Sequence, residues 1–264
     1  MVDWGRPEFM RHMLEENISL CFMRQFSGNI PYSHFLITEH MVDNRTFFSS
    51  KGIIQQAPLY VYPDKNKKDL FNQHQNEKEP NIPAAIFEKL QSVYRQKPSP
   101  EDILYYIYGV FYSNIYRTTY AEFLKIDFPR VPFTADYELF KKLGEMGKKL
   151  ADLHLLKSPA LDPPVAKFQG SGTKDRIEKI NYKEDEQRIY INKDKYFEGI
   201  TAEVWNYHIG GYQVLQKDLK DRKGRNMDDA PRYCRIVTAL SKTIEIQEQI
   251  DKIYPEVEKE LVQF

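Results

Sequence analysis

The sequence predicts an α+β protein in which mixed, short-stranded sheets pack with several helices and a long helix ends the chain. Three observations predict this class. Short apolar runs of strand length gather in the first third of the chain. Longer stretches with apolar residues three and four positions apart fill the middle, and a last helical pattern begins at about Ala230.

The expected strands come first along the chain. Residues 18–24 (ISLCFMR) and 57–62 (APLYVY) are short apolar runs suited to buried strands, and residues 35–38 are a third candidate. Residues 64–83 are rich in Lys, Asn, Gln and Pro. We therefore expect an exposed loop between the strands and the helices.

Three helices are expected in the middle of the chain. Residues 84–94 form the first, and Pro100 opens the second, followed by two acidic residues in its first turn. This second helix carries ILYYIYGVFYSNIY, apolar on nearly every face, which predicts burial at the centre of the domain. Two prolines in residues 128–132 interrupt the pattern, and residues 136–156 resume it as a third helix.

Residues 158–172 contain Pro, Gly and Ser and are the best candidate for a boundary. Beyond them, residues 176–182 and 187–192 are expected to pair as a hairpin. The division is then an N-terminal α+β part, residues 1–157, and a C-terminal part, residues 173–264, with the hairpin, a basic segment and the long helix. Because an amphipathic pattern starts almost at the first residue, we expect one compact unit cut from a longer chain.

Composition constrains the class of partner and the compartment. Lys and Arg number 38, as do Asp and Glu, so a nucleic-acid-binding surface would require local segregation of charge. No apolar run is long enough to span a membrane, and the N-terminus does not resemble a signal peptide. Two cysteines cannot form a disulfide framework. We expect a cytoplasmic protein without a membrane partner.

Motifs for catalysis are absent or incomplete. Residues 170–174 (GSGTK) lack the spacing of a phosphate-binding loop, and residues 162–165 (DPPV) lack the aromatic ring of an adenine-methyltransferase loop. The six histidines are dispersed and do not match zinc-ligand spacing. We therefore expect no catalytic residue, cofactor or metal in this chain, although Cys234 with His154 or His208 remains a possible nucleophile pair.

A dense basic segment is the strongest candidate for binding. Five cations lie within nine residues, preceded by an aromatic-rich run and the pair Gly210-Gly211. Lys and Arg contact DNA phosphates, and Arg also binds guanine edges; the alternative is a solvated helix end. The candidate DNA-contacting residues are Lys217, Lys220, Arg222, Lys223, Arg225, Tyr212 and Arg117.

The same segment belongs to three ordered blocks that resemble the C-terminal specificity domain of type ISP restriction–modification enzymes. The first is residues 205–225 (WNYHIGGYQVLQKDLKDRKGR), followed by YCRIV at 233–237. The second includes YIYGVF at 106–111 and FPRVP at 128–132, and the third is LADLHL at 150–155 after Gly147. Asp218 departs from the pattern, where the family usually has an aromatic residue.

The resemblance implies a DNA target-recognition domain that is not itself an enzyme. Double-stranded DNA and the methyltransferase domain of the parent chain would be its partners. That parent would be a site-specific adenine DNA methyltransferase and restriction endonuclease, and S-adenosylmethionine, ATP and Mg are implied for it. The alternative is a coupling module of the same enzyme that does not touch DNA. Since the shared WNY and GGY motifs recur in the family, we expect Trp205, Tyr207 and the pair Gly210-Gly211 mainly to hold the scaffold.

Overall fold

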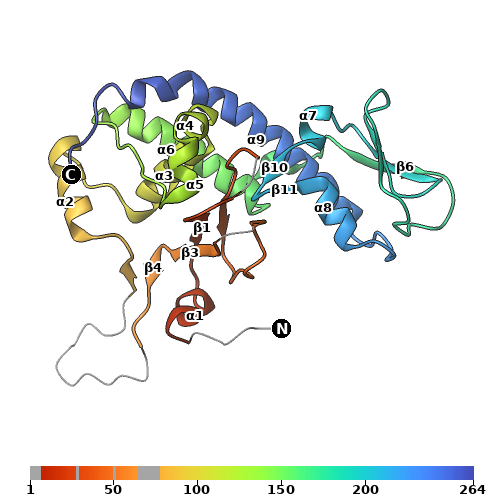
Figure 1. Cartoon of the computed structure of the whole chain (residues 1–264), viewed down its shortest axis with the longest axis horizontal. Helices are drawn as coiled ribbons and strands as arrows, with labels where there is room; N and C mark the ends of the chain where they lie inside the picture. Colours follow the sequence, from red (N-terminus) through yellow and green to blue (C-terminus); the bar gives the residue numbers. More distant parts are fainter. Residues whose placement is uncertain (1–6, 28–29, 50–51, 65–77) are drawn as a thin grey trace.

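The computed structural model describes residues 7–27, 30–49, 52–64 and 78–264, and it confirms the predicted α+β class. The molecule is elongated, and its last helix runs along much of its length (Figure 1). The helices are α1 (Pro7–Leu14), α2 (Ala84–Tyr94), α3 (Pro100–Tyr112), α4 (Asn114–Thr119), α5 (Ala121–Ile126), α6 (Tyr137–His154), α7 (Ala202–Trp205), α8 (Val214–Asp221), α9 (Ala230–Val257) and the 3-10 helix η1 (Pro159–Leu161).

The strands form small antiparallel sheets, with orders β2-β1-β3, β4-β5, β6-β9-β8-β7 and β10-β11 in the described residues. In the first sheet, Cys21 lies opposite Leu36 on one side and Gln56 on the other. The strands are β1 (Ser19–Met23), β2 (Phe35–Thr38), β3 (Ile54–Pro58), β4 (Tyr60–Val61), β5 (Glu79–Pro80), β6 (Lys167–Gly170), β7 (Asn181–Lys183), β8 (Arg188–Tyr190), β9 (Lys195–Glu198), β10 (His208–Ile209) and β11 (Tyr212–Gln213).

The run predicted as one strand at 57–62 is two strands with different partners. The side-chain amide of Asn17 explains the break, because it donates to the Tyr60 carbonyl at 2.8 Å and accepts from the Tyr60 N–H at 3.2 Å. They follow the last backbone bond on this side of β1, which the Leu59 N–H donates to the Ile18 carbonyl at 2.8 Å. In the predicted loop at 64–83, residues 79–80 instead form β5, and residues 65–77 lie outside the described part.

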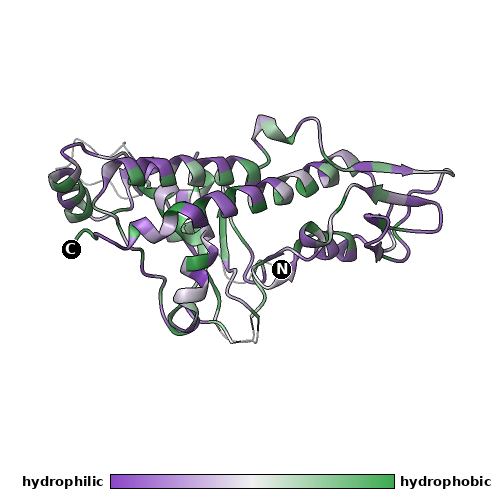
Figure 2. Ribbon diagram, turned by 90° about the horizontal axis from the view of Figure 1, so that it is seen from above, coloured by the Kyte–Doolittle hydropathy of each residue, from purple (hydrophilic) through white to green (hydrophobic). Residues whose placement is uncertain are grey.

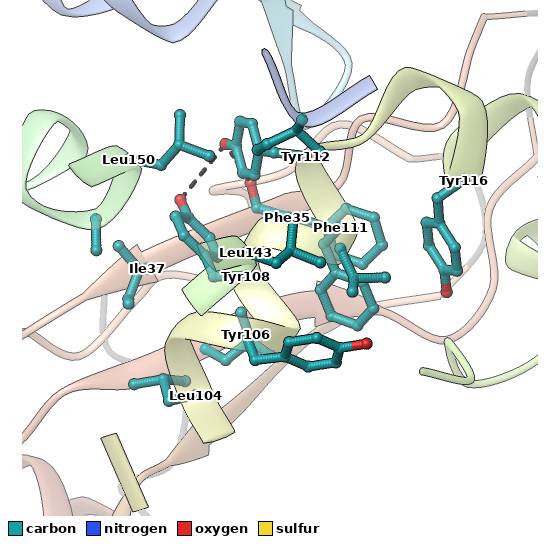
Figure 3. Close-up of a cluster of buried hydrophobic side chains, with 14 of the residues drawn as sticks. Phe35, Ile37, Leu104, Tyr106, Tyr108, Phe111, Tyr112, Tyr116, Leu143 and Leu150 are labelled. Atoms are coloured by element: carbon teal, nitrogen blue, oxygen red, sulfur yellow. Dashed lines mark hydrogen bonds between the residues drawn. The ribbon is translucent and has the colours of Figure 1, made fainter. Parts of the chain in front are cut away.

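Buried apolar side chains of the described residues form two clusters. The tyrosine-rich helix α3 is buried in the first of them, as its pattern predicts (Figure 3). The hydroxyl groups of buried tyrosines on α3 and its neighbouring helices have hydrogen-bond acceptors. Tyr106 donates to the Pro132 carbonyl at 2.7 Å, Tyr116 on α4 donates to the Arg130 carbonyl at 2.8 Å, and Tyr94 on α2 donates to the Thr134 carbonyl at 2.7 Å. The segment 130–134, in which prolines interrupt the helical pattern, thus supplies carbonyl acceptors. Because their hydroxyl groups are satisfied, tyrosines can occupy buried positions that would otherwise require apolar side chains.

A second hydrophobic cluster lies between the four-stranded sheet and the first half of α9. Phe197 of β9 packs on Tyr233 of α9, with ring centroids 4.4 Å apart, and Leu215 and Leu219 of α8 complete the layer. The predicted hairpin exists as β7 and β8 but is shorter than expected. Strands β6 and β9 were not predicted, and β6 lies inside the stretch taken as a connection.

Helix α9 belongs to both hydrophobic clusters. Its N-terminal half contributes Tyr233 and Val237 to the second cluster, and its C-terminal half contributes Ile250 and Tyr254 to the first. Figure 2 shows the same helix running from one end of the molecule towards the other. The division at residues 157 and 173 stays a prediction, because one helix packs in both parts.

Candidate nucleic-acid interface

The WNY and GGY motifs fasten the C-terminal part to the first one. Gly210 and Gly211 have φ values of 59° and 81°, and a Cβ on Gly210 would lie 2.1 Å from the Phe47 ring. The Gly210 carbonyl accepts from the Phe48 N–H at 2.7 Å, and its own N–H donates to the Ser33 carbonyl at 2.8 Å. Only glycine fits this joint.

The two aromatic residues before the joint are also internal. The indole of Trp205 stacks on Tyr182, with ring centroids 5.0 Å apart, and the Tyr207 hydroxyl donates to Gln247 of α9 at 2.7 Å. Gln247 in turn donates to the Tyr112 carbonyl at 2.9 Å. These contacts confirm that Trp205, Tyr207 and the Gly210-Gly211 pair hold the scaffold, whereas a DNA contact by Tyr212 stays a prediction.

Helix α8 presents the basic segment to solvent. Leu215 and Leu219 are buried, so the polar face of the helix points outwards. On that face Lys217 forms an ion pair with Asp221, and its ammonium group lies 5.0 Å from the centroid of the Tyr212 ring. Lys220 donates to the Gln216 side chain at 2.5 Å.

Asp218 occupies the position where an aromatic residue was expected from the family pattern. Its Oδ1 lies 3.3 Å from a guanidinium nitrogen of Arg222 and 3.3 Å from one of Arg232. Arg232 lies in the first turn of α9, and sequence reasoning missed it because it is 14 residues from Asp218. The carboxylate therefore holds two arginines side by side at the start of α9.

Lys223 and Arg225 differ from the other cations of the segment. Both are exposed, and within the described ranges neither side chain forms a hydrogen bond or an ion pair. The turn that carries them is nevertheless fixed. The Gly224 N–H donates to the Ile177 carbonyl at 2.8 Å, and the Ile177 N–H donates to the Arg225 carbonyl at 2.9 Å. The turn therefore carries two unpaired positive charges and is held in place by two backbone hydrogen bonds.

The last candidate from the sequence, Arg117, lies apart from this segment. It is half-buried, its Nε donates to the Phe111 carbonyl at 2.6 Å, and its guanidinium lies 4.5 Å from the centroid of the Tyr112 ring. Its charge also lowers the pKa of nearby His154. A DNA contact by Arg117 stays a prediction, and the structure gives its guanidinium interior partners.

The environments of Cys234 and His154, which were considered for catalysis, oppose such a role. Burial raises the pKa of the Cys234 thiol to about 11, so the thiol is protonated at neutral pH. The ring nitrogens of His154 contact the Tyr108 hydroxyl at 2.6 Å and the Thr243 hydroxyl at 2.9 Å. Burial, and then Arg117, lower its pKa to about 3. His208 contacts the Asn206 carbonyl at 2.6 Å.

The described residues contain neither a cluster of metal-ligating side chains nor a helix suited to a membrane. No group of three or more His, Cys, Asp or Glu side chains gathers as it would around a metal ion. None of the described helices combines the length and apolar character needed to cross a membrane.

The sequence matches a family model, the Type ISP C-terminal specificity domain, over residues 1–249. The chain belongs to this family. The resemblance seen in the three sequence blocks is thereby confirmed. Among curated proteins, none matches this specificity domain.

Solved structures share the fold of the specificity domain. LlaBIII, an ATP-dependent Type ISP restriction-modification enzyme bound to DNA, is 23% identical with a TM-score of 0.67 over 89% of this chain. A nuclease-deletion mutant of LlaGI, a Type ISP enzyme in complex with a DNA substrate mimic, is 21% identical with a TM-score of 0.62 over 89% of this chain. The DrdV–DNA complex is 20% identical with a TM-score of 0.63 over 93% of this chain. The matched regions span only 16%, 21% and 25% of those chains.

Proposed function

We propose that this specificity domain binds double-stranded DNA and recognises the target sequence of a restriction–modification enzyme. Family membership and three structural neighbours that were solved with DNA support the proposal. The observation that carries it is the anchored turn with Lys223 and Arg225. Both cations are exposed and unpaired, so a phosphate can approach them without breaking an existing ion pair.

The remaining cations of α8 and α9 extend the same basic surface. Arg222 and Arg232 are held by one carboxylate, which leaves the two guanidinium groups with donors to spare. Lys217 and Lys220 have partners on their own helix, which a phosphate would have to displace or share. We therefore expect Lys223 and Arg225 to contribute most to affinity, and Lys217 and Lys220 least.

The chemistry of the parent enzyme is proposed to lie outside this chain. The domain corresponds to between 16% and 25% of the chains of its structural neighbours, which leaves ample length for a methyltransferase and a nuclease with a motor. In this proposal the domain contacts the methyltransferase, which uses S-adenosylmethionine and flips its adenine while the duplex is held. ATP and Mg would serve the motor and the nuclease.

A salt titration tests DNA binding directly. Fluorescence anisotropy with a pool of random duplexes is expected to show affinity falling linearly with salt on logarithmic axes, with a slope of about −0.9 for each phosphate contact. Replacing Lys223 and Arg225 by Ala should weaken binding to all duplexes and reduce the steepness of the slope by about 1.8.

The matched control removes two exposed lysines from α6, Lys142 and Lys149, for which no ion pair is formed in the described residues. It changes net charge by the same amount and should leave the slope unchanged. Binding that is absent, or that ignores salt, contradicts the proposal. Equal weakening by the control variant would show that only total charge matters.

One observation favours the second candidate function, a coupling module that does not contact DNA. Phe123 and Ile126 on α5 are 68% and 64% exposed, and Phe128 just beyond them is 47% exposed. Such neighbouring apolar side chains are typical of a surface that another protein part covers. Salt-independent behaviour in the titration, together with lost docking in the Phe123→Ser/Ile126→Ser variant of the parent enzyme, would support this function instead.

A further inference from the structure

A polar hollow of about 530 Å³ adjoins the basic turn. It lies between residues 173–178, which precede β7, and residues 226–228, which lead into α9. Its volume is within the range of small-ligand sites. Its lining is mixed, with carboxylates, an amide and cations facing the same space.

The walls of the hollow are held by backbone hydrogen bonds between segments 50 residues apart. Arg176 and Asn226 form an antiparallel bridge, and the Met227 N–H donates to the Asp175 carbonyl at 2.8 Å. From behind, the side-chain amide of Asn192 donates to the carbonyls of Lys174 and Arg176 at 3.0 and 2.9 Å. The surface is therefore formed before any ligand binds.

Three side chains in the hollow have unused hydrogen-bonding capacity. Glu178, Asn226 and Asp228 are exposed, and within the described part of the chain none of them forms a hydrogen bond or an ion pair through its side chain. Lys174 and Arg176 lie beside them and are likewise unpaired there. A phosphate would suit the two cations but would be repelled by the unpaired carboxylates of Glu178 and Asp228.

The ligand must therefore offer hydrogen-bond donors next to anionic groups. Duplex DNA does so in its major groove, where cytosine N4 and adenine N6 amino groups are donors flanked by phosphates. Carboxylates accept from cytosine N4, and an Asn amide binds the N6 and N7 atoms of adenine as a pair. Because only amines of particular bases satisfy such acceptors, a contact here would carry sequence information.

We propose that this hollow is the base-reading site of the domain. Asn226, Asp228 and Glu178 accept hydrogen bonds from exocyclic amines of adenine and cytosine, while Lys174 and Arg176 contact the adjoining phosphates. The inference rests on the proposed function and deepens it, because it assigns base reading and phosphate binding to different side chains on the same face. Lys174, Arg176 and the three acceptors were not among the residues predicted from the sequence.

The test is enrichment of preferred sequences from a pool of random duplexes by the 264-residue chain and its variants. The double variant Asn226→Ala/Asp228→Ala is expected to lose the preference for adenine or cytosine at one or two positions, by about 5- to 150-fold per position. Its salt slope should be unchanged. Glu178→Ala is expected to relax a further position. Glu145→Ala on α6 also removes an exposed carboxylate and should preserve the whole preference.

Lys174 and Arg176, which are proposed to contact phosphates, should affect binding in a different way. Lys174→Ala/Arg176→Ala should weaken binding to all sequences alike and reduce the steepness of the salt slope by about 1.8. Since none of these exposed side chains forms a hydrogen bond or an ion pair within the described structure, thermal unfolding of each variant should match that of the wild type.

Two results would overturn the inference while leaving the proposed function intact. One is an unchanged preferred sequence in the Asn226→Ala/Asp228→Ala variant. The other is salt-dependent binding of the wild type without preference for any base. Absence of salt-dependent binding by the wild type would instead contradict the proposed function itself.

Discussion

Gly147 determines how closely α6 approaches α3. A Cβ at this position would lie 1.8 Å from the Tyr105 carbonyl oxygen and 2.8 Å from the Gly109 nitrogen, both on α3. Gly109 has the reciprocal role, because its Cβ would lie 2.6 Å from the Leu143 carbonyl. Both glycines lie in the blocks that the sequence shares with its family. Glycine is required at both positions because the backbones of α3 and α6 are in contact there.

The Gly147→Ala variant is therefore expected to lose stability. The added methyl group would force the two backbones apart, which places the loss at about 3 kcal/mol or more, the upper end for overpacked cores. Urea unfolding followed by circular dichroism measures it. Gly144→Ala on the same helix is the control, since its Cβ would come no closer than 3.7 Å. There the substitution should stabilise the helix by about 0.5–1 kcal/mol.

Two histidines make stability depend on pH. Burial lowers the pKa of His34 to about 4 and that of His154 to about 3. In the unfolded chain both imidazoles regain a pKa of about 6.5. The unfolded state therefore binds more protons between these pKa values. The contribution of the two histidines to the free energy of unfolding is fully present above about pH 6.5 and is lost as the pH decreases.

At pH 5 we expect a loss on the order of 2 kcal/mol for each histidine relative to pH 7.5. Urea unfolding at the two pH values measures it. His34→Gln keeps an N–H donor for the Phe48 carbonyl, which the ring contacts at 3.0 Å, but cannot titrate. This variant should show a smaller drop between the two pH values. An equal drop in variant and wild type would assign the dependence to other groups.

At the scale of elements, α9 caps α4 across a large sequence separation. Asp251 of α9 accepts from the Ser113 hydroxyl and the Asn114 N–H, each at 2.8 Å, and from the Ile115 N–H at 3.3 Å. These N–H groups belong to the first turn of α4, where no acceptor exists within the helix. The carboxylate thereby fixes a six-residue helix that would be marginal alone.

Asp251→Ala should lower the free energy of unfolding by about 1–2 kcal/mol, the usual effect of removing a helix cap. Glu248→Ala, one turn earlier on α9, removes an exposed carboxylate that has no partner within the described residues. Its effect should stay within about 0.5 kcal/mol. If the two variants unfold at the same urea concentration, the cross-helix cap contributes nothing to stability.

The elements that sequence reasoning predicted are those with a strong apolar period. The bounds of α2 agree with the prediction, and α3, α6 and α9 begin within one residue of the expected positions. Strand β6 lacked such a signal because three of its four residues are exposed, so no alternation marks it. Pairing with β9, whose residues lie some 28 positions later, makes it a strand.

The candidate site divides in the same way. Local charge density was enough to propose Lys223 and Arg225 as candidates. The hollow beside them could not be predicted, since it depends on the bridge between Arg176 and Asn226, which no local pattern reveals. Asp218 was noticed only as a departure from the family, whereas its contact with Arg232 required the arrangement of α8 against α9.

At the scale of the whole molecule, α9 links the two hydrophobic clusters and the GGY turn closes the same joint from the other side. Each cluster includes buried residues of α9: the N-terminal half contributes to the second cluster and the C-terminal half to the first. We therefore expect the chain to unfold as one cooperative unit.

Because α9 contributes to both clusters, it limits which segments can be exchanged between members of the family. A graft limited to the hollow and the basic turn, residues 173–178 and 222–228, leaves every buried residue of α9 in place. A larger graft that ends inside α9 would join half a helix from one protein to a core evolved with another. On the proposed base-reading role, new specificities should be introduced through the exposed residues of these two short segments, while the buried Ile177 and Met227 and the whole of α9 are left with their host.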